Sequence, residues 1–486
     1  MRIAIIKILA HQTWVNLLKS RATIGLMTLI SVLTLFALFT GSKNYKVQKE
    51  TQMTYRKMVR DNWENSPDKH PHRMAHYGYI AFREKHPLCI FDFGMESYTG
   101  NAVFLEAHKQ NTVNFSESSL STGILRFGEI SVAMILQTLL PLLIFFWGFN
   151  SIAADRENGT LKLLLSQGIR WTELILGRAL GLFAVANMVF SMAWMSSLVV
   201  LLENIFIRSA PIEMSYLYHF GILNFFYALY LFIMSLLAVV ISAKSPNTKS
   251  ALTKLIGIWL FFSIILPRLS QALGQSWHPA PSKIAFETAI ETELLQKGDS
   301  HNPDDPYFKT FKDSVLRAHK VSSIEGLSFN YSGLQMKEGE RMSSEIYLKH
   351  QHNLMKIYEK QLNTGRYLAF WNPFMAIKHL SMALTGTDFN TYKHFQNAAE
   401  IYRYQLAQQM NDWQIQYIRN KKLGEKDKPY FISKAFWKQF PDFQYHFLSL
   451  SQSLKNELLS AITLIGWFIG LLVWVQLMSK KLKPIE

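Results

Sequence analysis

Histidines are the residues in this sequence whose type and spacing are best suited to metal chemistry. Thirteen of the fifteen lie in two polar stretches, residues 41–129 and 271–455. Neutral imidazole is the commonest metal ligand, and three histidines are close enough in sequence to converge on one ion: His70, His72 and His76. Further ligands could come from Asp92, Glu106 and His108.

The pattern nevertheless matches no established closed metal site. Pro71 and Gly78 indicate an irregular turn, and histidines in such a turn commonly hydrogen-bond a loop to its domain. The sequence also lacks the His-Glu-x-x-His pattern of zinc hydrolases. We therefore expect no metal or other cofactor in this chain, with the three histidines as the candidate ligands should a metal be bound.

The elements that would carry these histidines lie between six strongly apolar runs. Each run is long enough to cross about 30 Å of hydrocarbon as a helix. They cover residues 22–40, 130–154, 173–202, 216–242, 251–270 and 456–479. The sequence thus predicts an all-α membrane protein with six transmembrane helices and two mainly helical extracytoplasmic domains, 41–129 and 271–455. In the second domain, helices are predicted over Ser282–Lys297, Lys337–Asn363 and Asp388–Lys422, with Asp388 as an N-cap.

Basic residues near the spans predict the orientation of the chain. They gather in residues 1–21, in the segment 155–172, in the segment between the fourth and fifth runs, and in the tail 480–486. All four fall on one side if the chain crosses six times, and that side should be cytoplasmic. Residues 1–21 alternate apolar and polar types around Trp14, which predicts an elbow helix lying in the membrane interface among lipids. The net charge of +16 is then an anchoring charge, and no nucleic-acid partner is expected.

Two pairs of glycines have the spacing that allows helices to approach closely. Gly177 and Gly181 lie in the third run, and Gly466 and Gly470 lie in the sixth. We expect them to pack helices within one bundle, with a dimer seam as the alternative. Pro141 and Pro267 should kink the second and fifth spans and free backbone carbonyls.

A charged segment between the second and third runs carries the clearest motif. It reads Asp155-Arg156-Glu157-Asn158-Gly159-Thr160-Leu161-Lys162-Leu163-Leu164-Leu165. This segment, 155–172, resembles the coupling helix of ABC type-2 exporter permeases, in which an acidic-Arg-Glu-x-Gly-Thr-Leu motif precedes paired leucines. The resemblance implies that the segment, with Asp155 and Thr160 in the motif, docks on an ATPase. Arg156 and Glu157 would make polar contacts, Gly159 would supply the turn, and the cleft would be filled by Leu161, Leu164 and Leu165.

The same resemblance implies the partners and the location. The sequence has no G-x-x-x-x-G-K-[ST] phosphate loop, so ATP and Mg²⁺ would be bound by a separate ATPase subunit, in two copies. A second permease chain, identical or paralogous, would complete the complex in the bacterial inner membrane. The outer stretches are similar to a branch of these permeases with large periplasmic insertions of unknown function. The complex would export a substrate or do mechanical work on a periplasmic partner protein, and this chain alone would not be an enzyme.

The alternative from another class is a membrane-anchored periplasmic metalloprotein or metalloenzyme that uses the outer histidines. The single cysteine, Cys89, excludes an intrachain disulfide and a cluster of thiolate ligands. Ionisable residues are nearly absent from the centres of the spans, which argues against transport driven by a proton or sodium gradient.

Overall fold

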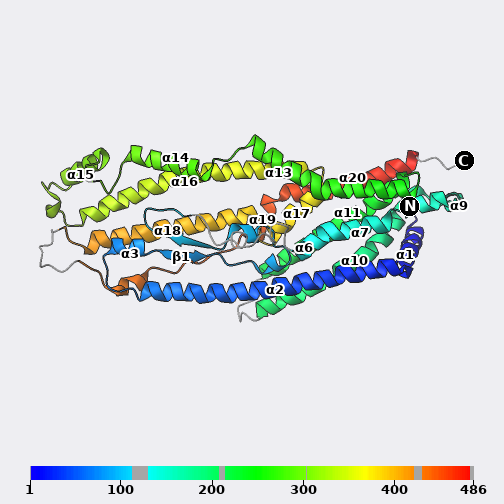
Figure 1. Cartoon of the computed structure of the whole chain (residues 1–486), viewed down its shortest axis with the longest axis horizontal. Coiled ribbons are helices and arrows are strands. Elements are labelled where there is room, and N and C mark those ends of the chain that lie inside the picture. Colours follow the sequence, from blue (N-terminus) through cyan, green and yellow to red (C-terminus); the bar gives the residue numbers. More distant parts are fainter. Residues whose placement is uncertain (1, 112–129, 207–213, 303, 421–429, 482–486) are drawn as a thin grey trace.

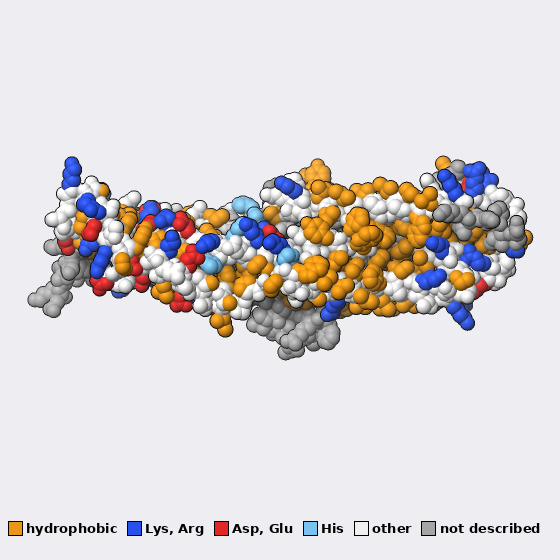
Figure 2. Space-filling model, turned by 90° about the horizontal axis from the view of Figure 1, so that it is seen from above, with side chains coloured by type: hydrophobic (Ala, Val, Ile, Leu, Met, Phe, Trp, Pro, Cys, Tyr) orange, Lys and Arg blue, Asp and Glu red, His pale blue; other side chains and the backbone are white. Residues whose placement is uncertain are grey.

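The computed structural model describes residues 2–111, 130–206, 214–302, 304–420 and 430–481. The chain is elongated and almost entirely helical (Figure 1). Apolar side chains cover one half of its length, where the six apolar helices lie, and charged side chains are more frequent on the other half (Figure 2).

Among the described residues, six helices are long and apolar enough to cross a membrane, as the sequence predicts. Four of them are α2 (Arg21–Glu64), α10 (Trp171–Phe206), α11 (Met214–Lys244) and α20 (Leu458–Lys481). Each of the other two consists of three consecutive elements. The second span consists of α6 (Val132–Met134), η3 (Ile135–Leu139) and α7 (Leu140–Gly148). The fifth span consists of α12 (Thr248–Leu260), η4 (Phe261–Ile265) and α13 (Leu266–Trp277). Helix α11 is the most buried of the six, whereas α2 and α12–α13 are the least buried.

The second and fifth spans each contain one π-helical turn directly before a proline helix. Pro141 and Pro267 have no N–H to donate, so carbonyls in the preceding turn lose their helical partner. Side chains from neighbouring helices supply the missing donors. The Tyr230 hydroxyl donates to the carbonyl of Gln137 at 2.8 Å, and the Asn372 amide donates to the carbonyl of Phe262 at 2.8 Å. The prolines thus also connect these spans to their neighbours.

The first polar segment begins as a direct continuation of a span. Helix α2 has 44 residues and extends about 66 Å, well past the apolar run that ends at residue 40. It is followed by α3 (Pro71–Tyr77), β1 (Tyr79–Phe82), η1 (Pro87–Ile90), α4 (Glu96–Thr99) and β2 (Ala102–Leu105). The two strands pair antiparallel in a small two-stranded sheet, and the rest of the described chain is almost entirely helical, in agreement with the predicted all-α class. Strands of four residues are too short for their alternation to be recognised in sequence.

The second polar segment is a set of long helices. In chain order they are α14 (Lys283–Lys297), α15 (Pro306–Ala318), η5 (Ile324–Gly326), α16 (Tyr331–Ala369), α17 (Pro373–Leu384), α18 (Phe389–Tyr417), η6 (Lys434–Gln439) and α19 (Leu450–Asn456). The predicted N-cap is confirmed, because the Asp388 carboxylate accepts a hydrogen bond from the N–H of Thr391 at 3.0 Å.

The two polar segments share one hydrophobic core, and we call them together the polar body (residues 43–111 and 278–456). Trp63 from α2 lies against both Trp437 and Tyr79 of β1, and Tyr79 also contacts Tyr402 of α18. In Figure 2 the polar body carries mixed charges, and an apolar surface covers the half with the six spanning helices.

At the opposite end from the polar body, α1 (Ile3–Lys19) runs across the long axis of the molecule and packs on α10, and α9 (Thr160–Ser166), which follows α8 (Ala153–Glu157), projects at the same end (Figure 1). We call this the α9 end. Lysine and arginine side chains gather there in Figure 2.

Candidate functional site

The segment between the second and third spans consists of two short helices joined at a glycine. Helix α8 ends at Glu157, Gly159 has φ of +75°, and α9 then runs from Thr160 to Ser166. A second glycine, Gly168, has φ of +78° before α10 begins. A Cβ at either glycine would meet nothing within 4 Å, so these positions favour glycine for its backbone conformation rather than for lack of space.

Asp155 connects both short helices to the third span. One carboxylate oxygen lies 3.0 Å from a guanidinium nitrogen of Arg178 on α10. The other accepts a hydrogen bond at 3.1 Å from the hydroxyl of Thr160, the first residue of α9. Movement of the glycine turn is thereby coupled to α10.

Arg156 and Glu157 connect the segment to the next two spans. The Arg156 guanidinium donates to the carbonyls of Ala243, at 2.6 Å, and of Ser245, at the C-terminal end of α11. The Glu157 carboxylate accepts from the backbone N–H of Thr248, at 3.0 Å, at the first residue of α12. Each charge has the sign that the helix end beside it favours. We refer to Asp155, Arg156 and Glu157 with these partners as the clamp.

The leucines of α9 divide between two faces. Leu161 is only 1% exposed and belongs to the core of the bundle, with Leu164 and Leu165 packed partly against it. Leu163 is 63% exposed and points away from that core. The expectation that Leu161 fills a cleft in a partner therefore needs correction, and Leu163 is the apolar side chain that α9 offers. Positions 161 and 165 are four residues apart on one helical face, a spacing that could have identified the inward side.

A further contact at the α9 end joins the start of α1 to the start of α10. Arg2 donates from its backbone N–H and from its guanidinium to the carboxylate of Glu173, at 2.8 and 2.7 Å, and also to the carbonyl of Gly168. The Glu173 side chain is fully buried. No local pattern predicts this pair, because the two residues are separated by 171 positions.

The four spaced glycines have two different environments. A Cβ on Gly177 would come within 2.6 Å of Leu9, and one on Gly181 within 2.6 Å of Thr13 and 2.4 Å of the carbonyl of Ala10. Gly177 and Gly181 thus allow α1 to pack closely against α10. A Cβ on Gly466 or Gly470 would meet nothing within 4 Å, so this pair packs against no described part of the chain.

The structure gathers four histidines within the polar body, two of which were among the three sequence candidates. His72 and His76 lie together on α3, with His108 and His301 beside them. His70 is instead the N-cap of α3, where its ring accepts from the N–H of His72 at 3.3 Å. The side chains of Asp92 and Glu106 have other partners, which are Ser381 for the first and Asn111 and Lys109 for the second.

Burial and the neighbouring rings favour the neutral form of His72 and His76. Burial, and then the charges of His108 and His76, lower the pKa of His72 to about 3. Burial also lowers the pKa of His76. For Glu340, which lies behind His108, burial acts to raise the pKa, but the hydrogen bond from His108 and the charge of Arg403 bring it to about 2.

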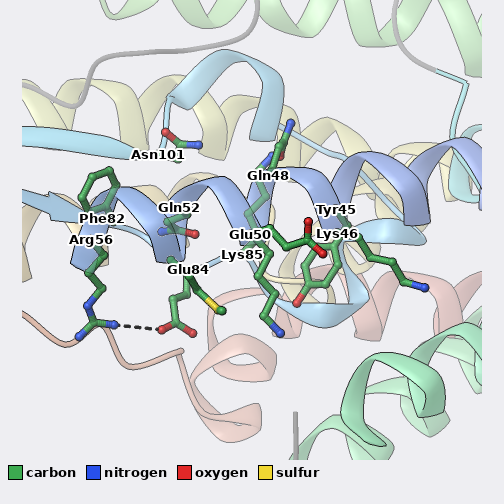
Figure 3. A pocket seen from close by; sticks show the side chains of 12 residues that line it. Tyr45, Lys46, Gln48, Glu50, Gln52, Arg56, Phe82, Glu84, Lys85 and Asn101 are labelled. Atoms are coloured by element: carbon green, nitrogen blue, oxygen red, sulfur yellow. Dashed lines mark hydrogen bonds and ion pairs between the residues drawn. The ribbon is translucent and has the colours of Figure 1, made fainter. Parts of the chain in front are cut away.

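A groove of about 460 Å³ opens along α2 in the polar body (Figure 3). Its walls combine basic, acidic and apolar side chains, among them Tyr45, Lys46, Lys49, Arg56, Phe82, Glu84 and Lys85. Arg56 and Glu84 bridge one end at 3.4 Å, as Figure 3 shows. A wall that combines apolar side chains with charges of both signs suits an amphiphilic molecule.

Comparison with known proteins identifies one related region. Residues 283–446, which run from α14 to the approach to α19, match a family described as a domain of unknown function (DUF3526). No match was found among curated proteins. The matched region is similar to that family over about a third of the chain and contains His301 and Glu340, but not the clamp.

Proposed function

We propose that this chain is the permease subunit of an ABC type-2 transporter, driven by ATP hydrolysis on a separate ATPase subunit. One observation carries the proposal: an exposed helix–glycine–helix segment, α8 to α9, is held by charged side chains to three apolar helices at the end of a six-helix bundle. This arrangement fits the coupling-helix motif of that class.

The clamp gives the segment a way to transmit force. A push on α9 reaches α10 through Asp155, the end of α11 through Arg156, and the start of α12 through Glu157. Tight packing makes the helices move as bodies, because interiors resist compression. Nucleotide-driven movement of the ATPase against α9 would therefore tilt three helices together.

The surface offered to the ATPase consists of the side of α9 that faces away from the bundle. Leu163 supplies an exposed apolar anchor, flanked by the exposed Lys162 and Ser166. ATP and Mg²⁺ belong to the partner in this scheme. Two ATPase copies and a second permease chain, identical or paralogous, complete the complex, and the low burial of α2 and α12–α13 supports a further helix partner or lipid there.

In this proposal the α9 end is cytoplasmic and the polar body is periplasmic, in the inner membrane of a bacterium. The lysines and arginines gathered at the α9 end support that orientation. Helix α1 would lie in the membrane interface and brace α10 through Gly177 and Gly181.

The work done by the complex is export of an amphiphile or mechanical work on a periplasmic partner. The groove along α2 supports the first, because its mixed wall suits an amphiphile. The continuous α2 supports the second, since one rigid helix joins the bundle to the polar body.

The anchor residue provides the test. Leu163→Asp should weaken binding of the purified permease to its ATPase by at least tenfold, because a charge replaces the apolar side chain that enters the partner. Leu295→Asp is the matched control, since Leu295 is 73% exposed on α14 at the other end of the molecule. Equal affinities for the two variants would refute docking through α9.

The second candidate function is a membrane-anchored periplasmic metalloprotein or metalloenzyme. The cluster of four histidines favours it. Stoichiometric metal in the purified chain without any ATPase, lost in a His72→Ala/His76→Ala variant, would support this candidate.

A further inference from the structure

Four histidine rings from three separate parts of the chain meet at one point of the polar body. His72 and His76 come from α3, His108 follows β2, and His301 lies between α14 and α15. One ligand atom from each of His72, His108 and His301 lies within 4.8 Å of the other two. The Nε2 atoms of His72 and His76 are 3.2 Å apart.

These distances are close to those of a tetrahedral metal site. With Zn–N bonds of about 2.0–2.1 Å, neighbouring ligand nitrogens are about 3.3 Å apart and the ring centres about 5 Å apart. Five of the six pairs among the four rings have centres between 4.7 and 6.2 Å apart. The sixth pair is that of His76 and His301, and the side chain of His301 is half exposed.

Two of the rings are oriented by carboxylates on the side away from the cluster. Nδ1 of His108 lies 3.1 Å from the buried carboxylate of Glu340, and Nδ1 of His301 lies 3.5 Å from the half-exposed carboxylate of Asp299. Metal-binding histidines usually donate their second N–H to such a group, which fixes the tautomer and leaves Nε2 for the metal. Glu340 is itself held by Arg403 at 2.6 Å.

The backbone at His108 has a conformation that suits a functional position. Its φ is +59°, which is uncommon for a residue other than glycine. Its backbone N–H donates to Glu340 at 3.0 Å, so one carboxylate holds both the main chain and the ring. Nε2 of His108 is buried with no hydrogen-bond partner in the structure. A buried polar atom of this kind calls for a partner, and a cation among the rings would provide one.

We propose that His72, His76, His108 and His301 bind one divalent transition-metal ion, with Zn²⁺ as the favoured occupant. Four imidazole nitrogens suit Zn²⁺ or Cu²⁺ and not Mg²⁺ or Ca²⁺, which prefer oxygen ligands. Four protein ligands occupy all coordination positions of a tetrahedral ion, so the site is a closed, structural one. It fastens the loop between α14 and α15, in the second polar segment, to α3 in the first.

This proposal stands apart from the permease function. A zinc clasp could serve a transporter or a protein of another class, and its test needs no ATPase.

The test uses the full chain in detergent, purified with an affinity tag free of histidine and stripped of metal by a chelator. Calorimetric titration with Zn²⁺ should give one site per chain. Addition of Co²⁺ should give the intense visible absorption of tetrahedral nitrogen coordination. His301→Ala should weaken Zn²⁺ binding at least tenfold, and it should fold normally because its side chain is half exposed.

Asp299→Asn tests the carboxylate that lies beside His301 and should weaken Zn²⁺ binding about tenfold. His352→Ala is the control, because His352 is exposed on α16 and should leave binding unchanged. Circular dichroism confirms that each variant is folded. Absence of tight Zn²⁺ binding in the wild type, equal affinity in the His301→Ala variant, or weak octahedral Co²⁺ absorption would each overturn the proposal.

Discussion

Removal of Arg156 should release the α8–α9 segment from the spanning helices. The guanidinium makes two charge-assisted hydrogen bonds to carbonyls at the end of α11, those of Ala243 and Ser245. Such bonds are each worth about 1.5–3 kcal/mol when buried, and partial exposure of Arg156 reduces them by about half. The Arg156→Ala substitution should therefore cost the attached state about 2 kcal/mol in total. That energy corresponds to an approximately 30-fold rise in the population of the released segment.

The release can be measured as a distance within the chain. Spin labels at Lys162→Cys on α9 and Lys249→Cys on α12 would report the separation of the segment from the fifth span. Labelling would be selective, because the single native cysteine, Cys89, is buried. In Arg156→Ala the distribution of distances should broaden, and ATP hydrolysis stimulated by the permease should fall while ATPase binding through Leu163 persists.

Two further variants sharpen this experiment. Arg156→Lys should be intermediate, because a lysine ammonium cannot reproduce the forked contact with two carbonyls. Arg170→Ala removes an exposed arginine at the same end outside the clamp and should behave as wild type. Distances and stimulated hydrolysis in Arg156→Ala that match those of Arg170→Ala would refute the clamp.

Three further predictions concern packing, charge and orientation. Gly181→Leu should destabilise the packing of α1 on α10 by about 1–3 kcal/mol, measured by thermal unfolding. Gly470→Leu should cause no such loss, since a side chain there meets open space. Equal losses of stability in the two variants would refute the different roles of the two glycines. Arg403→Met should lower the free energy of unfolding by about 3–5 kcal/mol in denaturant, because it leaves the buried Glu340 and Glu400 without their cationic partner. Arg341→Met should lower it by under about 1 kcal/mol, because the ion pairs of Arg341 are exposed. In intact cells, a membrane-impermeant maleimide should label Leu295→Cys and not Leu163→Cys; the reverse pattern would invert the proposed orientation.

The membrane-spanning helices were predictable because each carries its own signal. Long apolar runs are local features, and all six appear as helices in the structure. The N-cap at Asp388 is likewise local, since its partner is three residues away. The positions at which the helices end were less predictable. Helix α2 continues to Glu64 through a polar sequence, where contacts with the rest of the polar body rather than apolar content hold the helix.

The candidate sites depend on contacts that no local pattern encodes. The histidine cluster joins His72 to His301 across 229 positions, and sequence proximity alone pointed to His70, which caps a helix instead. In the clamp, the sequence motif identified Asp155, Arg156 and Glu157 but not their partners within the chain. The inward turn of Leu161 follows from the packing of α9 on the bundle, which the motif does not specify.

The permease function itself is tested most directly by isolating the chain with its natural partners. The tagged full-length chain would be expressed from its native operon, purified in mild detergent and analysed by mass spectrometry for stoichiometric partners. We expect recovery of an ABC ATPase in a one-to-one ratio with permease chains, with ATP hydrolysis that depends on the clamp. Recovery of this chain alone, with no ATPase, would contradict it.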